Sequence, residues 1–92
     1  MNAYIVVQFT PINKELLPVY SAKAAVTIAN HQGEFLAKPE VKSLVGLSDY
    51  QYNAIINFPS EELANQWFHS LEYRALIELR DKAMDATFLL VS

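Results

Sequence analysis

The sequence predicts an α+β fold in which helices cover one face of a four-stranded antiparallel sheet. Four short segments rich in apolar residues are typical of β-strands, and two longer segments carry apolar residues at helical spacing. The order of these segments is β-α-β-β-α-β, in which strands and helices are mixed along one chain. The chain has 92 residues, so we expect one domain that spans residues 1–92.

The first predicted strand covers residues 3–10. Its alternate residues form two faces, one with Ala3, Ile5, Val7 and Phe9, the other with Tyr4, Val6 and Gln8. Both faces are largely apolar, which is typical of a central strand covered on both sides.

A helix is predicted within residues 13–32. Asn13 is a suitable N-cap, but Pro18 lacks an amide donor and disfavours helical geometry at Leu17. We therefore expect a short turn at 13–17 and the main helix at 18–31. Gly33 follows it as a C-cap glycine. The apolar stripe of this helix consists of Leu17, Tyr20, Ala24 and Ile28.

Two strands should follow this helix. The first covers residues 34–38, is broken at Pro39-Glu40, and could continue over residues 41–45 toward Gly46. The second covers residues 50–58. One of its faces is apolar, and the other carries the amides of Gln51, Asn53 and Asn57.

The second helical region is predicted to be broken. Ser60 is a helix cap followed by two acids in the first turn, and Ser70 is a second cap that starts a helix over residues 71–83. Trp67 and Phe68 belong to the buried side of the first part. Residues 86–91 form the last predicted strand.

This order of elements predicts a ferredoxin-like βαββαβ sandwich. Its helices cover one sheet face, so Tyr4, Val6 and Ile55 would remain exposed on the other face of a single chain. The composition is 52% hydrophobic, slightly above the usual ~45–50%. We therefore expect a homodimer in which two open sheet faces meet to form a dimeric α+β barrel.

Composition excludes several classes of protein. The chain has no cysteine, which excludes thiolate metal sites and cysteine nucleophiles and suits a cytoplasmic location. Its 7 basic and 10 acidic residues form no basic stripe, so no nucleic-acid partner is expected. No apolar run is long enough for a membrane helix. His31 and His69 lack metal-ligand spacing, so neither a metal nor a cofactor is expected.

Four residues are candidates for a ligand pocket: Arg80, Tyr73, His31 and Asn57. Arg80 shares a stripe with Tyr73 where an apolar residue is expected, so it could anchor a polar ligand, or its stem could pack on the core. The Tyr73 hydroxyl could point into the same space, or Tyr73 could be a core aromatic residue. His31 could act as an acid or base in a cavity, or its positive charge could interact favourably with the negative end of a helix dipole. Asn57 could line a barrel cavity or bridge two copies.

Several motifs together resemble the family called domain of unknown function 1330. They are Phe58-Pro59-Ser60, Trp67-Phe68, Ser70, Glu72-Tyr73, Arg80, and Phe88-Leu89-Leu90-Val91, with Gly33-Glu34-Phe35-Leu36 and Leu44-Val45-Gly46 before them. The resemblance implies a ferredoxin-like protomer, a dimeric α+β barrel and no established reaction. The chain departs from the family pattern where Val45 and Asn57 stand in place of frequent acids, which weakens any enzymatic inference.

Three functions are consistent with these observations. The first is a homodimer that binds a small apolar or aromatic molecule between helices and sheet, with or without cofactor-free oxygenation or isomerisation. The second is a non-catalytic interaction or structural dimer. The third is a barrel that handles haem or flavin. A closed pocket of roughly 300 Å³ or more that is lined by Tyr73, Arg80 or His31 would favour ligand binding.

Overall fold

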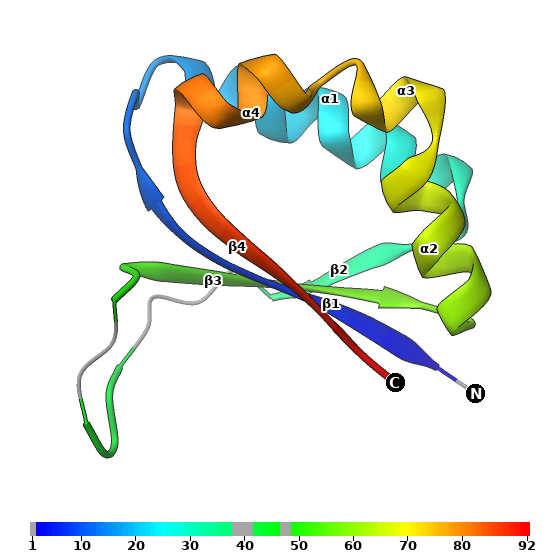
Figure 1. Ribbon diagram of the computed structural model, residues 1–92, viewed down its shortest axis with the longest axis horizontal. Helices are drawn as coiled ribbons and strands as arrows, with labels where there is room; N and C mark the ends of the chain where they lie inside the picture. Colours follow the sequence, from blue (N-terminus) through cyan, green and yellow to red (C-terminus); the bar gives the residue numbers. More distant parts are fainter. Residues whose placement is uncertain (1, 38–41, 47–48) are drawn as a thin grey trace.

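The computed structural model describes residues 2–37, 42–46 and 49–92. Figure 1 shows two layers, with the helices on one side of the sheet and the other side open. The predicted α+β fold is confirmed. The elements are β1 (Ala3–Pro11), α1 (Leu16–Asn30), β2 (Glu34–Ala37), β3 (Tyr52–Phe58), α2 (Glu61–His69), α3 (Leu71–Arg74), α4 (Ile77–Ala83) and β4 (Met84–Val91).

The sheet has the strand order β2-β3-β1-β4, and all three strand pairs are antiparallel. β1 is central, as its two apolar faces predicted. Alternate residues of β1 and β3 point to opposite faces. Those that face the helices are buried, whereas Tyr4, Val6 and Gln8 on the other face are only half-buried in a single chain.

The core lies between the sheet and the helices. Its largest fully buried side chains are Phe58, Trp67 and Tyr73. The Trp67 ring lies 4.3 Å from that of Tyr73 and 5.5 Å from that of Phe58, measured between centroids. This aromatic cluster joins α2 and α3 to the sheet, so the predicted core role of Trp67 is confirmed.

The start of α1 differs from the prediction. Asn13 caps the helix as expected, because its Oδ1 accepts hydrogen bonds from the amides of Glu15 and Leu16. The helix nevertheless begins at Leu16, and the Leu17 amide donates to the Asn13 carbonyl over 3.1 Å. Pro18 therefore lies in the first turn, where a missing amide hydrogen breaks no helical bond.

The end of α1 also differs. Gln32, not Gly33, takes the left-handed conformation, with φ of 65°. The Gly33 amide donates to the Ile28 carbonyl and the Gln32 amide to the Ala29 carbonyl, which is a Schellman motif. Gly33 is required for a different reason, because a Cβ there would lie 2.6 Å from the Phe58 ring.

The second helical region is interrupted twice. Ser60 Oγ accepts from the Leu63 amide, and Ser70 Oγ accepts from the Tyr73 amide, so both predicted caps are confirmed. The predicted helix over residues 71–83 is two helices, because α3 ends at Arg74 and α4 begins at Ile77.

The connection from β2 to β3 contains no further strand in the described residues 42–46, so the expected continuation of the strand is wrong there. Val41 lies outside the described residues. Within the described part of the chain, no helix has the length and apolar character needed to span a membrane.

Candidate functional site

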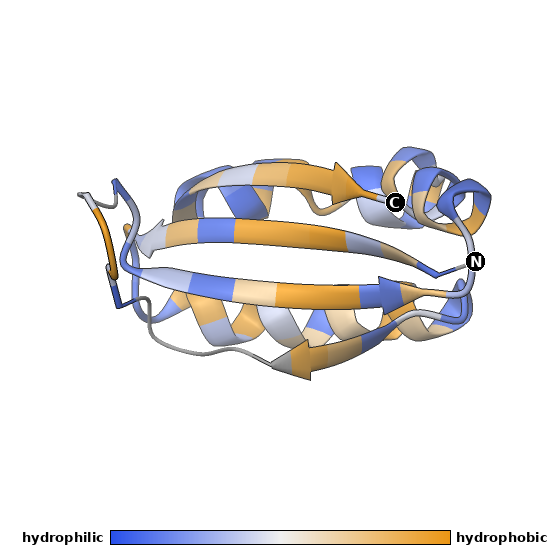
Figure 2. Cartoon of the chain, turned by 90° about the horizontal axis from the view of Figure 1, so that it is seen from below, coloured by the Kyte–Doolittle hydropathy of each residue, from blue (hydrophilic) through white to orange (hydrophobic). Residues whose placement is uncertain are grey.

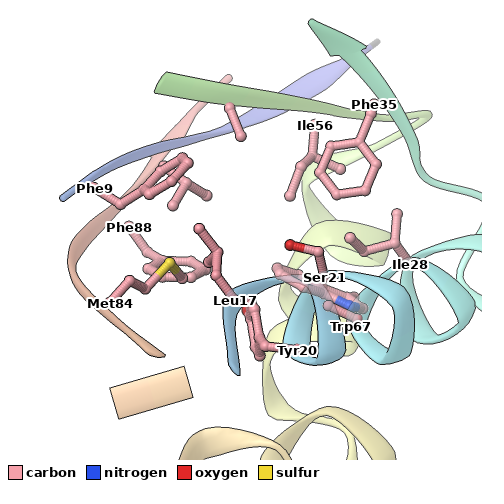
Figure 3. A pocket seen from close by; sticks show the side chains of 13 residues that line it. Phe9, Leu17, Tyr20, Ser21, Ile28, Phe35, Ile56, Trp67, Met84 and Phe88 are labelled. Atoms are coloured by element: carbon pink, nitrogen blue, oxygen red, sulfur yellow. The ribbon is translucent and has the colours of Figure 1, made fainter. Parts of the chain in front are cut away.

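An apolar cavity of about 50 Å³ lies between α1 and the sheet and is partly open to solvent. Figure 3 shows its wall, formed on one side by α1 and on the other by strands. For comparison, a dry cavity of roughly 150 Å³ holds benzene. The lining residues are Val7, Phe9, Leu17, Tyr20, Ser21, Ala24, Ile28, Phe35, Ala54, Ile56, Trp67, Met84 and Phe88.

Small residues on both sides contribute to the cavity. Ala24 of α1 and Ala54 of β3 both line it, and each fills only the volume of a methyl group. The α1 residues on this wall recur at intervals of three or four, which places them on one face of the helix. The β3 residues Ala54 and Ile56 recur at an interval of two on the helix-facing side.

A chain of polar contacts leads from solvent to the cavity wall. Asp81 is exposed and accepts a hydrogen bond from Arg80 Nε over 3.2 Å. Arg80 Nη1 donates to the Tyr73 hydroxyl over 3.4 Å, and the hydroxyls of Tyr73 and Tyr20 lie 2.7 Å apart. The guanidinium carbon of Arg80 also stands 5.1 Å from the Phe88 ring centroid. Arg80 thus connects to Tyr20 and Phe88, both of which line the cavity.

The charges in this chain of contacts are well defined. Burial raises the pKa of Tyr20 above its usual value, and the contact with Tyr73 adds to this effect, so the Tyr20 hydroxyl stays neutral. Burial alone would lower the pKa of Arg80, but its contacts with Tyr73 and Asp81 outweigh burial and raise it. Arg80 therefore keeps its positive charge, and the hydroxyls of Tyr73 and Tyr20 connect it to the cavity wall.

Most other polar groups near the cavity are paired within the chain. Trp67 Nε1 donates to Thr27 Oγ1 over 3.0 Å, and the Thr27 hydroxyl donates to the Ala24 carbonyl. Ser21 differs, because the structure shows no hydrogen bond from its hydroxyl to another described residue. Figure 3 shows this hydroxyl turned into the cavity, so it is the polar group that a bound molecule would meet.

The structure brings two of the four predicted pocket residues together and leaves two apart. Arg80 and Tyr73 touch through the hydrogen bond described above, but neither lines the cavity directly. His31 lies at the end of α1, where its Nδ1 donates to the Thr27 carbonyl and is 3.3 Å from Glu72 Oε1. Asn57 lies on the open sheet face. A pocket formed by these four residues stays a prediction.

None of the four predicted residues lines the cavity, and the hydroxyl-bearing residues of its wall, Tyr20 and Ser21, had no predicted role at the site. Tyr20 is part of the predicted apolar stripe of α1. Its hydroxyl could have indicated a role at the site, because a buried hydroxyl needs a hydrogen-bond partner. Its partner, Tyr73, is 53 residues away along the chain. Among the residues that the structure describes, no cluster of three or more metal-ligating side chains is found.

The open sheet face is seen from below in Figure 2, and the strand register arranges its residues in rows across the strands. The strand register places Gln8 beside Asn53 and Thr87, and Val6 beside Ile55 and Leu89. A third row contains Tyr4, Asn57 and Val91. Asn53 Oδ1 and Asn57 Oδ1 are both buried without a hydrogen-bond partner. Since both atoms are already shielded within one chain, the two amides must rotate before another molecule can bond to them.

Comparison with known families gives one match. The family described as "Domain of unknown function (DUF1330)" matches residues 2–92. A comparison with curated proteins finds no match.

Solved structures with the same fold are distant in sequence. A protein of unknown function from Rhodopseudomonas palustris has a TM-score of 0.78 at 13% identity, over 98% of this chain and 80% of that one. SnoaB from Streptomyces nogalater, described as a cofactor-independent oxygenase, has a TM-score of 0.73 at 13% identity, over 99% of this chain and 91% of that one. A dimeric ferredoxin-like protein of unknown function from Thermobifida fusca has a TM-score of 0.55 at 11% identity, over 100% of this chain and 91% of that one. At these identities the likeness concerns the fold.

Proposed function

The chain belongs to the DUF1330 family, and on this premise we propose that it forms a cytoplasmic homodimer through its open sheet face and binds a small apolar or aromatic molecule under α1. The observation that carries the binding proposal is the apolar cavity between α1 and the sheet. The dimer proposal is supported by the open face and by the Thermobifida fusca neighbour, which is described as dimeric.

The open face has the composition of an interface. Its middle row, Val6, Ile55 and Leu89, is apolar and crosses three strands without cover from any helix (Figures 1 and 2). Leaving such a continuous apolar surface in water is costly, and a second copy would remove it from solvent. A face-to-face arrangement of two sheets is a common way to do so.

The dimer proposal is tested by sedimentation equilibrium of the intact chain and of Val6→Asp. We expect a dimer at micromolar concentration for the intact chain and a monomer for the variant, because a carboxylate in the middle of the interface would be buried without a partner. Val26→Asp, on the outer face of α1, is the matched control and should remain dimeric. A dimer that survives Val6→Asp contradicts the proposed interface.

The cavity must widen to hold an aromatic ring. At about 50 Å³ it is smaller than the volume that the ring needs and than the roughly 300 Å³ that would favour ligand binding, and Tyr73, Arg80 and His31 do not line it. Two of its lining residues, Leu17 and Met84, have flexible side chains that can change rotamer, and Met adapts especially well to irregular spaces. We therefore propose an apolar ligand of about the size of one ring, with one polar group positioned to meet the Ser21 hydroxyl.

Titration with toluene and phenol, followed by methyl chemical shifts, tests the binding proposal. We expect shifts at Val7, Ala24 and Ile56, and tighter binding of phenol because its hydroxyl can pair with Ser21. Ala24→Val should weaken binding of both probes by narrowing the cavity. Ala22→Val, on the exposed side of α1, is the control. Shifts confined to other parts of the molecule, or no shifts at millimolar concentration, favour the non-catalytic interaction dimer instead.

Cofactor-independent oxygenation is a second candidate function. It is favoured by the likeness to SnoaB, which is described as a cofactor-independent oxygenase. In this chain, the Arg80 cation would favour an anionic form of a bound molecule through the hydroxyls of Tyr73 and Tyr20. Oxygen uptake with hydroquinone, a phenol of one ring, tests this candidate, and uptake above that of the probe alone should fall in Arg80→Gln. Absence of uptake with a probe that binds contradicts it.

A further inference from the structure

The connection between β2 and β3 carries an apolar tip that lies almost entirely in water. The tip consists of Leu44 and Val45, and each is 96% exposed. The chain bends here, where the Ser43 hydroxyl lies against the Gly46 carbonyl and Gly46 has φ of 79°. Single exposed apolar residues are common on protein surfaces. Two adjacent aliphatic side chains that are both almost fully exposed are less usual.

The tip lies on the side of the sheet that has no helices. In Figure 1 the segment 42–46 hangs below one end of the sheet, away from the helix layer. Figure 2 shows the same segment beside that end, where it leaves the open face uncovered. A second copy packed on the open face would therefore lie alongside the tip.

The open face is polar near the tip, and at its far end it is apolar along β4. The row of Gln8, Asn53 and Thr87 lies toward the end of the sheet from which the tip extends, since β3 begins there. At the other end of the sheet, β4 finishes with Leu89 and Val91, which are 45% and 50% exposed. An apolar tip is matched by this end of β4, beside which Tyr4 and Asn57 lie on the neighbouring strands. It is mismatched by the row of Gln8, Asn53 and Thr87, which offers it no apolar side chain.

We propose that the tip of one copy packs against Leu89 and Val91 of the partner subunit. The inference rests on the proposed homodimer and adds how its two copies are oriented. A two-fold axis that exchanges the two ends of the sheet brings each tip to the partner's apolar end, and the contact then occurs twice. A two-fold axis that kept both tips at one end would place them over the polar rows.

The test compares dissociation constants by sedimentation equilibrium. The variant Leu44→Ser/Val45→Ser removes the tip's apolar surface, and we expect its dimer to dissociate at least about tenfold more readily. The matched control, Val26→Ser/Leu71→Ser, removes one valine and one leucine that are 61% and 86% exposed on the helix layer. The control should keep the dissociation constant of the intact chain.

A double-mutant cycle between Val45→Ser and Val91→Ser tests the assigned contact. The double variant should lose less affinity than the sum of the two single variants, because each change removes the same contact. An intact chain that stays monomeric overturns both the homodimer and this inference. A dimer whose affinity is unchanged by the tip variant, or a cycle that is additive, overturns the inference and leaves the homodimer standing.

Discussion

At the scale of single residues, buried polar groups are paired across the helix layer. Thr27 shows how closely this pairing is coupled to packing. Its hydroxyl accepts a hydrogen bond from Trp67 Nε1 and donates one to the Ala24 carbonyl, while Trp67 is the centre of the aromatic cluster. One small hydroxyl thus satisfies the indole of the largest core residue.

Thr27→Val should reveal the contribution of this pair. Valine has nearly the same shape but leaves the Trp67 N–H without a partner, so we expect a loss of about 1–3 kcal/mol in the free energy of unfolding. Urea unfolding followed by the fluorescence of the single tryptophan measures it. Thr27→Ser keeps the hydroxyl and should cost less. Equal losses for both variants would assign the effect to packing instead of the hydrogen bond.

Tyr20 should make stability sensitive to alkaline pH. Burial raises its pKa in the folded chain above the ordinary value of 10.0, which it regains on unfolding. Its stabilising effect is therefore fully present below pH 10.0 and is lost as pH rises further, because the unfolded chain releases the proton first.

Tyr20→Phe tests this coupling through urea unfolding at several pH values from about 9 to 11. Above the ordinary tyrosine pKa, the intact chain should lose up to about 1.4 kcal/mol per pH unit more than the variant. Parallel losses in the two proteins would show that Tyr20 is accessible to water in the folded chain.

At the scale of elements, local patterns predicted where helices and strands exist, and tertiary contacts decided their ends. Asn13, Ser60 and Ser70 were predictable as caps because each acts on an amide within three residues. The end of α1 was not predictable from local sequence. Gly33 stands where a helix-ending glycine is expected, but Gln32 takes the left-handed position, and Gly33 instead leaves room for the Phe58 ring.

Substitutions at the end of α1 should separate these two roles. Gly33→Ala places a Cβ against Phe58 and Ile28, and we expect a loss of about 1–3 kcal/mol in the free energy of unfolding. Gln32→Gly should instead stabilise the chain by about 1 kcal/mol, because glycine adopts positive φ freely. Thermal and urea unfolding measure both effects. A neutral Gly33→Ala would mean that Phe58 can move aside.

At the scale of the whole molecule, the order of elements and the two faces of β1 were enough to predict the fold and its open sheet face. The candidate site was less predictable. Arg80 and Tyr73 were recognised because polar groups stood on an apolar stripe, and they do meet. The cavity is lined by Ala24 of α1 and Ala54 of β3, and neither helical nor strand periodicity predicts that these two residues line the same space.

The central claim is that this chain is half of a symmetric barrel closed through the open sheet face. Isotope-filtered NMR on a mixture of labelled and unlabelled protein tests it most directly, because it detects only contacts between copies. We predict intermolecular contacts at the methyl groups of Val6, Ile55 and Leu89. Intermolecular contacts at Val26 and Leu71 on the helix layer, or none at any concentration, would contradict the claim.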